Sequence, residues 1–213
     1  MAWHLAHASS ALDENVASAI EEVADSAGNR GGLAASAVFR EHAAMRTPDA
    51  ARRASRALTA ARAKHRGGAR GSALRLLAVA QAGPLDDLMR RRADLLSAQL
   101  TADGPGAARE LAARWLLEAA AQLEPLDPLT AREGYADALY AAQAAGRQAG
   151  EDHLRKVAAA GNPPYDDDDL ASGLAVLITD GFAAGVPALR RALDVLTDQA
   201  KHAAPGCGRL LLG

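Results

Sequence analysis

Residues 47–84 read TPDAARRASRALTAARAKHRGGARGSALRLLAVAQAGP. Thr47-Pro48 opens this stretch, Gly67-Gly68 divides it, and Gly83-Pro84 closes it. Proline cannot continue a preceding helix, and glycine readily adopts the backbone conformation that ends one. The stretch therefore predicts two helices joined by a tight turn, with the second helix returning along the first. The apolar positions expected to pack are Ala51, Ala54, Leu58 and Ala61, then Leu74, Leu77 and Val79.

Helix-breaking glycines and prolines also recur on both sides of this hairpin. Gly31-Gly32 precedes it and Gly104-Pro105-Gly106 follows it, each about 37 residues from Gly67-Gly68, and Glu124-Pro125 adds a further break. A fixed period of this length is typical of stacked helical repeats. We predict an all-α fold without a sheet, a right-handed superhelical solenoid of antiparallel hairpins similar to tetratricopeptide repeats. The expected repeat domain covers 1–203 and is followed by a flexible tail at 204–213; its hairpins lie at about 13–46, 48–83, 85–123, 127–160 and 166–203.

Apolar spacing defines individual helices within this frame. An apolar stripe begins at Val16 and Ile20, and Asp13 is placed to cap that helix. Pro48 is expected in the first turn of the next hairpin, and Pro187 at the entrance of the last helix. In the third hairpin the expected stripe is Leu111, Trp115, Ala119 and Leu123; in the last hairpin Leu174, Leu177 and Ile178 are expected to meet Leu189, Leu193 and Leu196.

Composition restricts the class of protein. The chain has 213 residues, of which 49% are hydrophobic, 23% charged and only 3% aromatic, so we expect a folded, alanine-rich helical protein without large ligand-stacking cavities. The one cysteine, Cys207, cannot form an internal disulfide. No export signal and no apolar run long enough to span a membrane is present in the sequence. A cytoplasmic location is the expectation.

Charge is unevenly distributed around a net value of −2. From Arg52 to Arg92, eleven arginine and lysine residues stand against only Asp86 and Asp87. Such a basic belt can neutralise nucleic-acid phosphates. Here no aromatic residue interleaves the arginines, so docking against an acidic neighbour is favoured over direct nucleic-acid binding.

The sequence carries no recognised catalytic motif. None of the three lysines follows a glycine as in a P-loop, and no serine lies in a Gly-x-Ser-x-Gly turn. His4 and His7 have a spacing that permits a shared metal ion, but no matching carboxylate or cysteine accompanies them. The acidic run Asp166 to Asp169 fits the positive end of a following helix better than a calcium loop. We expect no enzyme activity, no cofactor and no metal.

A partner-binding surface is the expected functional feature. Trp115 either fills space between hairpins, which is favoured, or opens onto a groove. The candidate surface comprises Trp115, Arg90, Arg91 and Tyr135. A second apolar edge at Trp3 and Leu5 could support self-association.

Several segments resemble one family. They are Ala2 to Ala6, the Gly31-Gly32 turn, and Leu116 to Leu139, in which Glu-Pro-Leu-Asp-Pro at 124–128 is followed by Ala131-Arg132-Glu133. These segments look like the helical-repeat region of large actinobacterial LuxR-type transcriptional regulators, and the resemblance spans roughly 2–200. In that family a STAND-class nucleotide-binding module precedes the repeats and a DNA-reading helix-turn-helix follows them. This chain has neither the P-loop nor the DNA-reading helices, so ATP hydrolysis and promoter binding do not transfer to it.

The expected function is therefore regulatory binding. The resemblance implies a sensor or protein-interaction arm whose partners are a protein or neighbouring regulator domains, with a small-molecule inducer as a further ligand class. An independent repeat scaffold binding a protein or peptide is the first alternative. An unrecognised helical enzyme is the second, and it would require Tyr135, Asp137, His153 and Arg155 to surround a buried cavity.

Overall fold

The computed structural model describes residues 12–104, 108–145, 155, 157–159 and 170–203. Every regular element in this part of the chain is a helix, and none of it is strand. The all-α prediction is confirmed to that extent. The helices are α2 (Glu14–Asn29), α3 (Leu33–Arg46), α4 (Ala50–Arg66), α5 (Arg70–Ala82), α6 (Asp87–Ala102), α7 (Ala108–Leu123), α8 (Pro128–Ala145), α10 (Leu170–Asp180) and α11 (Phe182–Ala203).

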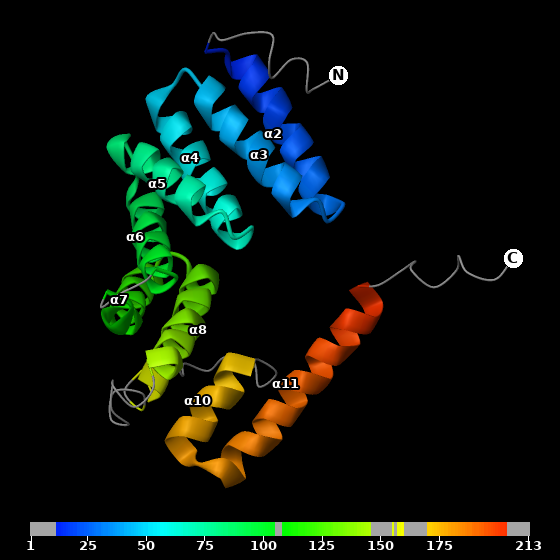
Figure 1. Cartoon of the computed structure of the whole chain (residues 1–213), viewed down its shortest axis with the longest axis vertical. Helices are drawn as coiled ribbons and strands as arrows, with labels where there is room; N and C mark the ends of the chain where they lie inside the picture. Colours follow the sequence, from blue (N-terminus) through cyan, green and yellow to red (C-terminus); the bar gives the residue numbers. More distant parts are fainter. Residues whose placement is uncertain (1–11, 105–107, 146–154, 156, 160–169, 204–213) are drawn as a thin grey trace, which may run out of the picture.

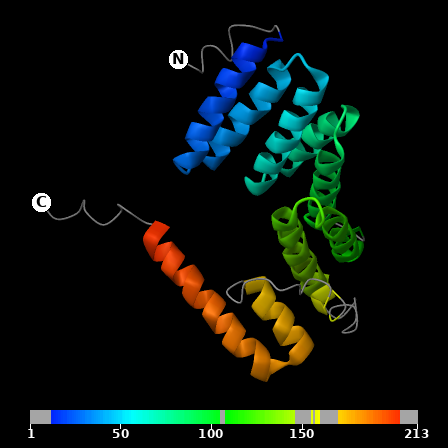
Figure 2. The ribbon, with the colours of Figure 1, turned by 180° about the vertical axis from the view of Figure 1, so that it is seen from behind.

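Consecutive helices pack in neighbouring pairs along an open arc. Figures 1 and 2 show α2 and α3 at one end of the arc and α10 and α11 at the other. Contacts are extensive within α2–α3, α4–α5, α6–α7 and α10–α11, which occupy four of the five expected hairpin ranges. Contacts are equally extensive for α3–α4 and α7–α8, and sparser for α5–α6. The row is therefore more continuous than a set of separate hairpins.

An aspartate begins every second helix from α2 to α8. The side chains of Asp13, Asp49, Asp86 and Asp127 accept hydrogen bonds from backbone N–H groups in the first turns of α2, α4, α6 and α8. These bonds satisfy donors that have no partner within the helix. The predicted cap at Asp13 is confirmed, and its three counterparts repeat it at nearly regular intervals.

Turn glycines act at two positions that the sequence indicated, Gly31 and Gly68, and at Gly181, which it did not indicate. Gly31 and Gly68 have φ of +80° and +72° between the helices of the first two pairs, and Gly181 has +87° between α10 and α11. Residues with a Cβ atom rarely adopt this conformation, so glycine is required there. The structure shifts two predicted helix starts: Pro48 lies before the Asp49 cap, and α11 already begins at Phe182, which puts Pro187 inside it.

Helix α6 joins two parts of the core. Its Ala93, Leu96 and Leu100 pack with α4 and α5, whereas its Leu95 and Ala98 pack with α7 and α8. These side chains are almost fully buried, so the chain cannot part at α6 without exposing apolar surface. Much of the core is alanine, which allows helices to approach closely.

The predicted stripe of α7 was wrong at its first two positions. Leu111 and Trp115 are 51% and 40% exposed, while Ala112 and Leu116 are buried. α7 contacts both α6 and α8, so its buried face is turned toward the space between them. The same kind of error affects Leu74 and Ala51, which are exposed on α5 and α4.

The last pair is held by small residues more than by leucines. A Cβ atom on Gly185 would lie only 2.4 Å from Cα of Leu177, so α10 and α11 cross very closely at this point. Ala188 and Ala192 are buried, but Leu193 and Leu196 are exposed, which corrects the predicted leucine packing.

Parts of the expected architecture lie outside the described residues. They include Trp3, Leu5, His4, His7, Asp166 to Asp169 and Cys207. Of the return segment expected before residue 160, the structure describes 155 and 157–159; Val157 packs with the α7–α8 core and Ala158 with Leu139. Within the described part, no helix has the length and apolar character needed to cross a bilayer.

Candidate functional site

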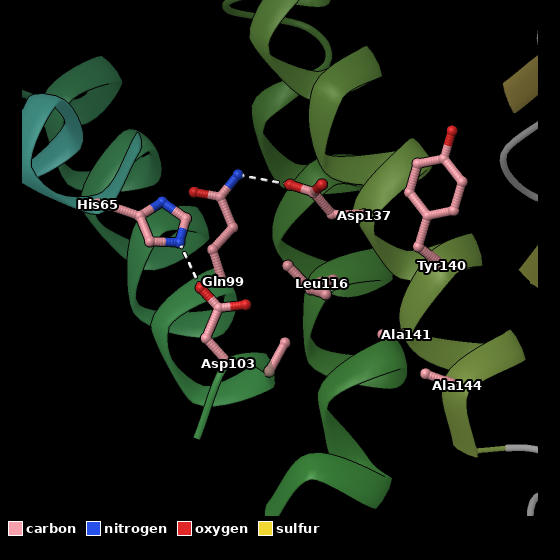
Figure 3. Close-up of a pocket in the computed structure, with 9 residues that line it drawn as sticks. His65, Gln99, Asp103, Leu116, Asp137, Tyr140, Ala141 and Ala144 are labelled. Carbon is pink, nitrogen blue, oxygen red and sulfur yellow. Dashed lines mark hydrogen bonds and ion pairs between the residues drawn. The ribbon is translucent and has the colours of Figure 1, made fainter. Parts of the chain in front are cut away.

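A polar cavity lies where α4, α6, α7 and α8 meet. Its volume is about 320 Å³, at the lower end of the range of small-ligand sites. His65 near the end of α4 forms one side, and α8 forms the opposite side (Figure 3). The lining residues are His65, Gln99, Ala102, Asp103, Leu116, Asp137, Tyr140, Ala141 and Ala144.

Two hydrogen bonds organise its polar residues. His65 Nε2 lies 2.7 Å from Asp103 Oδ2, and Gln99 Nε2 donates to Asp137 Oδ2 at 2.7 Å (Figure 3). An ionised carboxylate can only accept, so His65 Nε2 is the donor in its pair. Each bond joins residues 38 positions apart, close to the repeat period: His65 of α4 is joined to Asp103 at the end of α6, and Gln99 of α6 to Asp137 of α8.

The cavity is an unfavourable place for negative charge. Burial raises the pKa of the Asp137 carboxyl above its ordinary value, and the carboxylates of Glu133 and Asp103 act in the same direction. The hydrogen bond from Gln99 and the charge of His65 oppose this rise without cancelling it. The negative charge of ionised Asp137 is therefore not fully compensated by the charges and hydrogen bonds around it.

Several oxygen atoms in the cavity are hydrogen-bond acceptors without a donor in the described part of the chain. The His65 Nε2–H and one N–H of the Gln99 amide are engaged by the two aspartates, while among the described residues nothing donates to Asp103 Oδ1, Asp137 Oδ1 or Gln99 Oε1. Ala141, Ala144 and Leu116 supply apolar wall. Within the described residues no group of three histidine, cysteine or acidic side chains could hold a metal ion. The cavity is thus suited to a donor-rich ligand with an apolar part.

A second concavity contains Trp115. It has a volume of about 330 Å³ and lies between α6 and α7. Arg91 contacts two residues of this groove. Its Nη1 donates to Gln122 Oε1 at 2.6 Å and lies 3.7 Å from Asp94 Oδ2. The indole is half exposed, so the less favoured interpretation of Trp115, that it opens onto a groove, describes it better. The groove is lined by Asp94, Ser97, Ala98, Thr101, Trp115, Glu118, Ala119 and Gln122.

The other predicted surface residues are dispersed. Arg90 lies near the start of α6, where it donates to the Leu85 carbonyl and contacts Asp87. Tyr135 is only 5% exposed, and its hydroxyl donates to Glu124 at 2.8 Å. Including Tyr135 in a partner surface was therefore wrong, because its ring belongs to the α6–α8 core.

The cluster required by the enzyme alternative is not seen in the described residues. Tyr135 is in the core, Asp137 lines the cavity and Arg155 is exposed, while His153 lies outside the described residues. Sequence reasoning missed His65, Gln99, Asp103 and Tyr140. The 38-residue spacing of the two hydrogen-bonded pairs is the signal that could have found three of them.

Much of the basic belt pairs within the chain. Arg56 contacts Glu14 and Glu21 of α2, and Lys64 contacts Glu41 of α3. Arg62 contacts Glu133, and Arg92 contacts Asp127, both acids of the α8 region. The N–O separations in these pairs are 3.0 Å or less. The acids that pair with the belt thus lie in other helices of the same chain, and docking of the belt against an acidic partner stays a prediction.

Comparison of the chain with family models, with curated proteins and with solved structures gave no match.

Proposed function

We propose that this chain is a helical-repeat sensor and protein-interaction arm of a LuxR-type transcriptional regulator, with its hairpins stacked as a TPR-like solenoid. The resemblance of residues 116–139 supports the regulator family. In the structure, Glu124 of the Glu-Pro-Leu-Asp-Pro segment accepts from Tyr135, and Asp127 caps α8 and contacts Arg92. These residues hold the α7–α8 turn, so their agreement with the family pattern has a structural reason. A cytoplasmic location is part of the same proposal.

One observation carries the binding role. Side-chain bonds 35 to 38 residues apart connect α2 to α4, α4 to α6 and α6 to α8. Repeats stacked in this way place equivalent helices side by side and provide an extended surface for a partner. The polar cavity lies on this row, since His65, Gln99 and Asp137 come from α4, α6 and α8.

The pairing of the basic belt favours a protein partner over nucleic acid. Arginines already engaged by Glu14, Glu21, Glu133 and Asp127 would have to exchange these acids for phosphates. Such an exchange cancels much of the electrostatic gain on which nucleic-acid binding depends.

Site-specific photo-crosslinking in native cells tests this function. A benzophenone amino acid replaces Tyr140, which is 43% exposed at the cavity, and Leu74, which is 41% exposed on α5, serves as the matched control. We expect one protein partner, or another region of the same polypeptide, to be captured from position 140 and not from position 74. Equal capture, or none, at the two positions would contradict the proposal.

An independent repeat scaffold is the second candidate function, supported by the cavity and the Trp115 groove alone, both of which need no further domains. The coding sequence on either side of the chain distinguishes the two. Continuity with a nucleotide-binding module and a DNA-reading module supports the regulator arm. If a partner is captured at position 140 and the flanking coding sequence encodes no such modules, the scaffold is supported.

A further inference from the structure

We propose that the cavity between α4, α6, α7 and α8 binds a basic group on an aliphatic stem, an ammonium or guanidinium such as a lysine or arginine side chain of the partner. This deepens the proposed function by naming what the arm recognises, and it rests on that function for the source of the ligand. The proposal depends on the shape, the hydrogen bonding and the charge of the cavity.

Hydrogen bonding disfavours an anionic ligand. One N–H of the Gln99 amide donates to Asp137 and the His65 Nε2–H donates to Asp103, so these two N–H groups are not available to an incoming carboxylate or phosphate. The second oxygens of both aspartates and the Gln99 carbonyl oxygen are acceptors without a donor among the described residues. An ammonium group has three donors and no acceptor, and a guanidinium has five. A cationic group therefore supplies the donors that these acceptor oxygens lack.

Shape and burial support the aliphatic stem. Leu116 is fully buried beneath the cavity, and Ala141 and Ala144 line the α8 side together with Tyr140. Methylene groups can lie against this wall while the charged end reaches the carboxylates, as long basic side chains commonly do. The cavity volume of about 320 Å³ is sufficient for a single lysine or arginine side chain.

The charges around the cavity also favour a cation. Asp103 and Asp137 face the cavity, and Glu133 contributes further negative charge, while His65 is the one basic residue among those that line it. A bound cation would compensate the Asp137 carboxylate that its present surroundings destabilise. Ligand binding would thus relieve an unfavourable feature of the free protein.

The test uses small model compounds and the full chain. Nα-acetyl-lysine N-methylamide, Nα-acetyl-arginine N-methylamide and n-butylammonium are titrated, with Nα-acetyl-norleucine N-methylamide as the neutral match. The readouts are the NMR signals of the Gln99 side-chain amide at the cavity and of the Trp115 indole at the other groove. We expect saturable shifts of Gln99 with the cationic compounds, with dissociation constants on the order of millimolar, and none with the norleucine compound.

Two substitutions sharpen the result. Asp137→Asn keeps an acceptor for Gln99 but removes the charge, and we expect about tenfold weaker binding. Asp94→Asn, in the Trp115 groove, is the matched control and should leave the affinity unchanged. Helical circular dichroism of both variants shows that they remain folded.

The outcomes separate this inference from the proposed function. Equal shifts with the norleucine compound, absence of saturation by about 50 mM, or unchanged affinity in Asp137→Asn would overturn the basic-group inference. A protein crosslinked at position 140 through a segment without lysine or arginine would overturn it too, while leaving the binding arm supported. Tighter binding of n-butylammonium than of the lysine compound would support the cation site and assign it to free amines, against a protein partner.

Discussion

At the scale of single residues, two aspartates illustrate opposite effects of position. Burial alone would raise the pKa of Asp127, but the hydrogen bonds from Thr130 and the bond and charge of Arg92 more than offset it, so that pKa is lowered. For Asp137, burial prevails over the Gln99 bond and the pKa is raised. The first carboxylate stabilises the fold when ionised, and the second does so when protonated.

Asp137→Asn should therefore increase stability at neutral pH. A raised pKa in the folded state gives a stabilising contribution that is complete below the unfolded pKa, near 3.8, and lost as the pH rises through the folded pKa. An asparagine at this position does not titrate and still accepts from Gln99. We expect the variant to exceed the wild type in thermal midpoint at pH 7, with the difference shrinking toward pH 3.5. A midpoint difference that stays constant with pH would contradict this account.

At the scale of elements, the register of α7 determines which of its leucines matters. Leu116 is fully buried and packs with α6 and α8, whereas Leu111 is half exposed. Leu116→Ala should lower the free energy of unfolding by about 2–5 kcal/mol. Leu111→Ala should cost less than about 1 kcal/mol. Urea denaturation of both variants measures the difference, and similar losses would restore the register predicted from the sequence.

Gly134 shows how closely α8 approaches its neighbours. A Cβ atom there would lie 2.7 Å from a Leu95 methyl carbon and 3.0 Å from Cβ of Ala120. Although alanine favours helix by up to about 1 kcal/mol, overpacking in Gly134→Ala should outweigh that gain and cost about 1–3 kcal/mol net.

Gly71→Ala is the matched control on α5. Its added Cβ would meet only the far end of the Arg75 side chain, at the ordinary contact distance of 3.9 Å, so this variant should gain up to about 1 kcal/mol. Denaturation midpoints that move in the same direction for both glycines would show that helix propensity, and not packing, controls position 134.

At the scale of the whole molecule, ion pairs connect one helix pair to the next. Arg56 of α4 reaches Glu14, Ser18 and Glu21 of α2 as well as Thr47, and its side chain is only 13% exposed. Removing it leaves several partly buried acceptors without a donor. Arg56→Ala should therefore lower the free energy of unfolding by roughly 1–3 kcal/mol.

Arg52→Ala serves as the comparison for Arg56. Arg52 approaches the same Glu14 at 3.4 Å, but its side chain is 66% exposed. Exposed pairs contribute little, so we expect a change within about 0.5 kcal/mol. Chemical denaturation of the wild type and of both variants measures the two losses. Equal losses for the two arginines would mean that the inter-pair network does not stabilise the arc.

The sequence by itself determined where helices begin and end. Gly31, Gly68, the prolines and the capping Asp13 act through backbone conformation and local hydrogen bonds, which depend on neighbours in the chain. The all-helical class followed from these local signals, and so did most helix bounds. Pro48 and Pro187 were misplaced by a few residues because a proline tolerates more than one position near a helix start.

Only the tertiary structure decided which apolar face of α7 is buried, that Tyr135 belongs to the core, and that His65, Gln99 and Asp137 share one cavity. Alanine occurs all around these helices, so periodicity alone does not specify one buried face. A cavity formed by α4, α6, α7 and α8 depends on how far successive pairs rotate against each other. That rotation is set by contacts such as Gly134 against Leu95, between residues far apart in the chain.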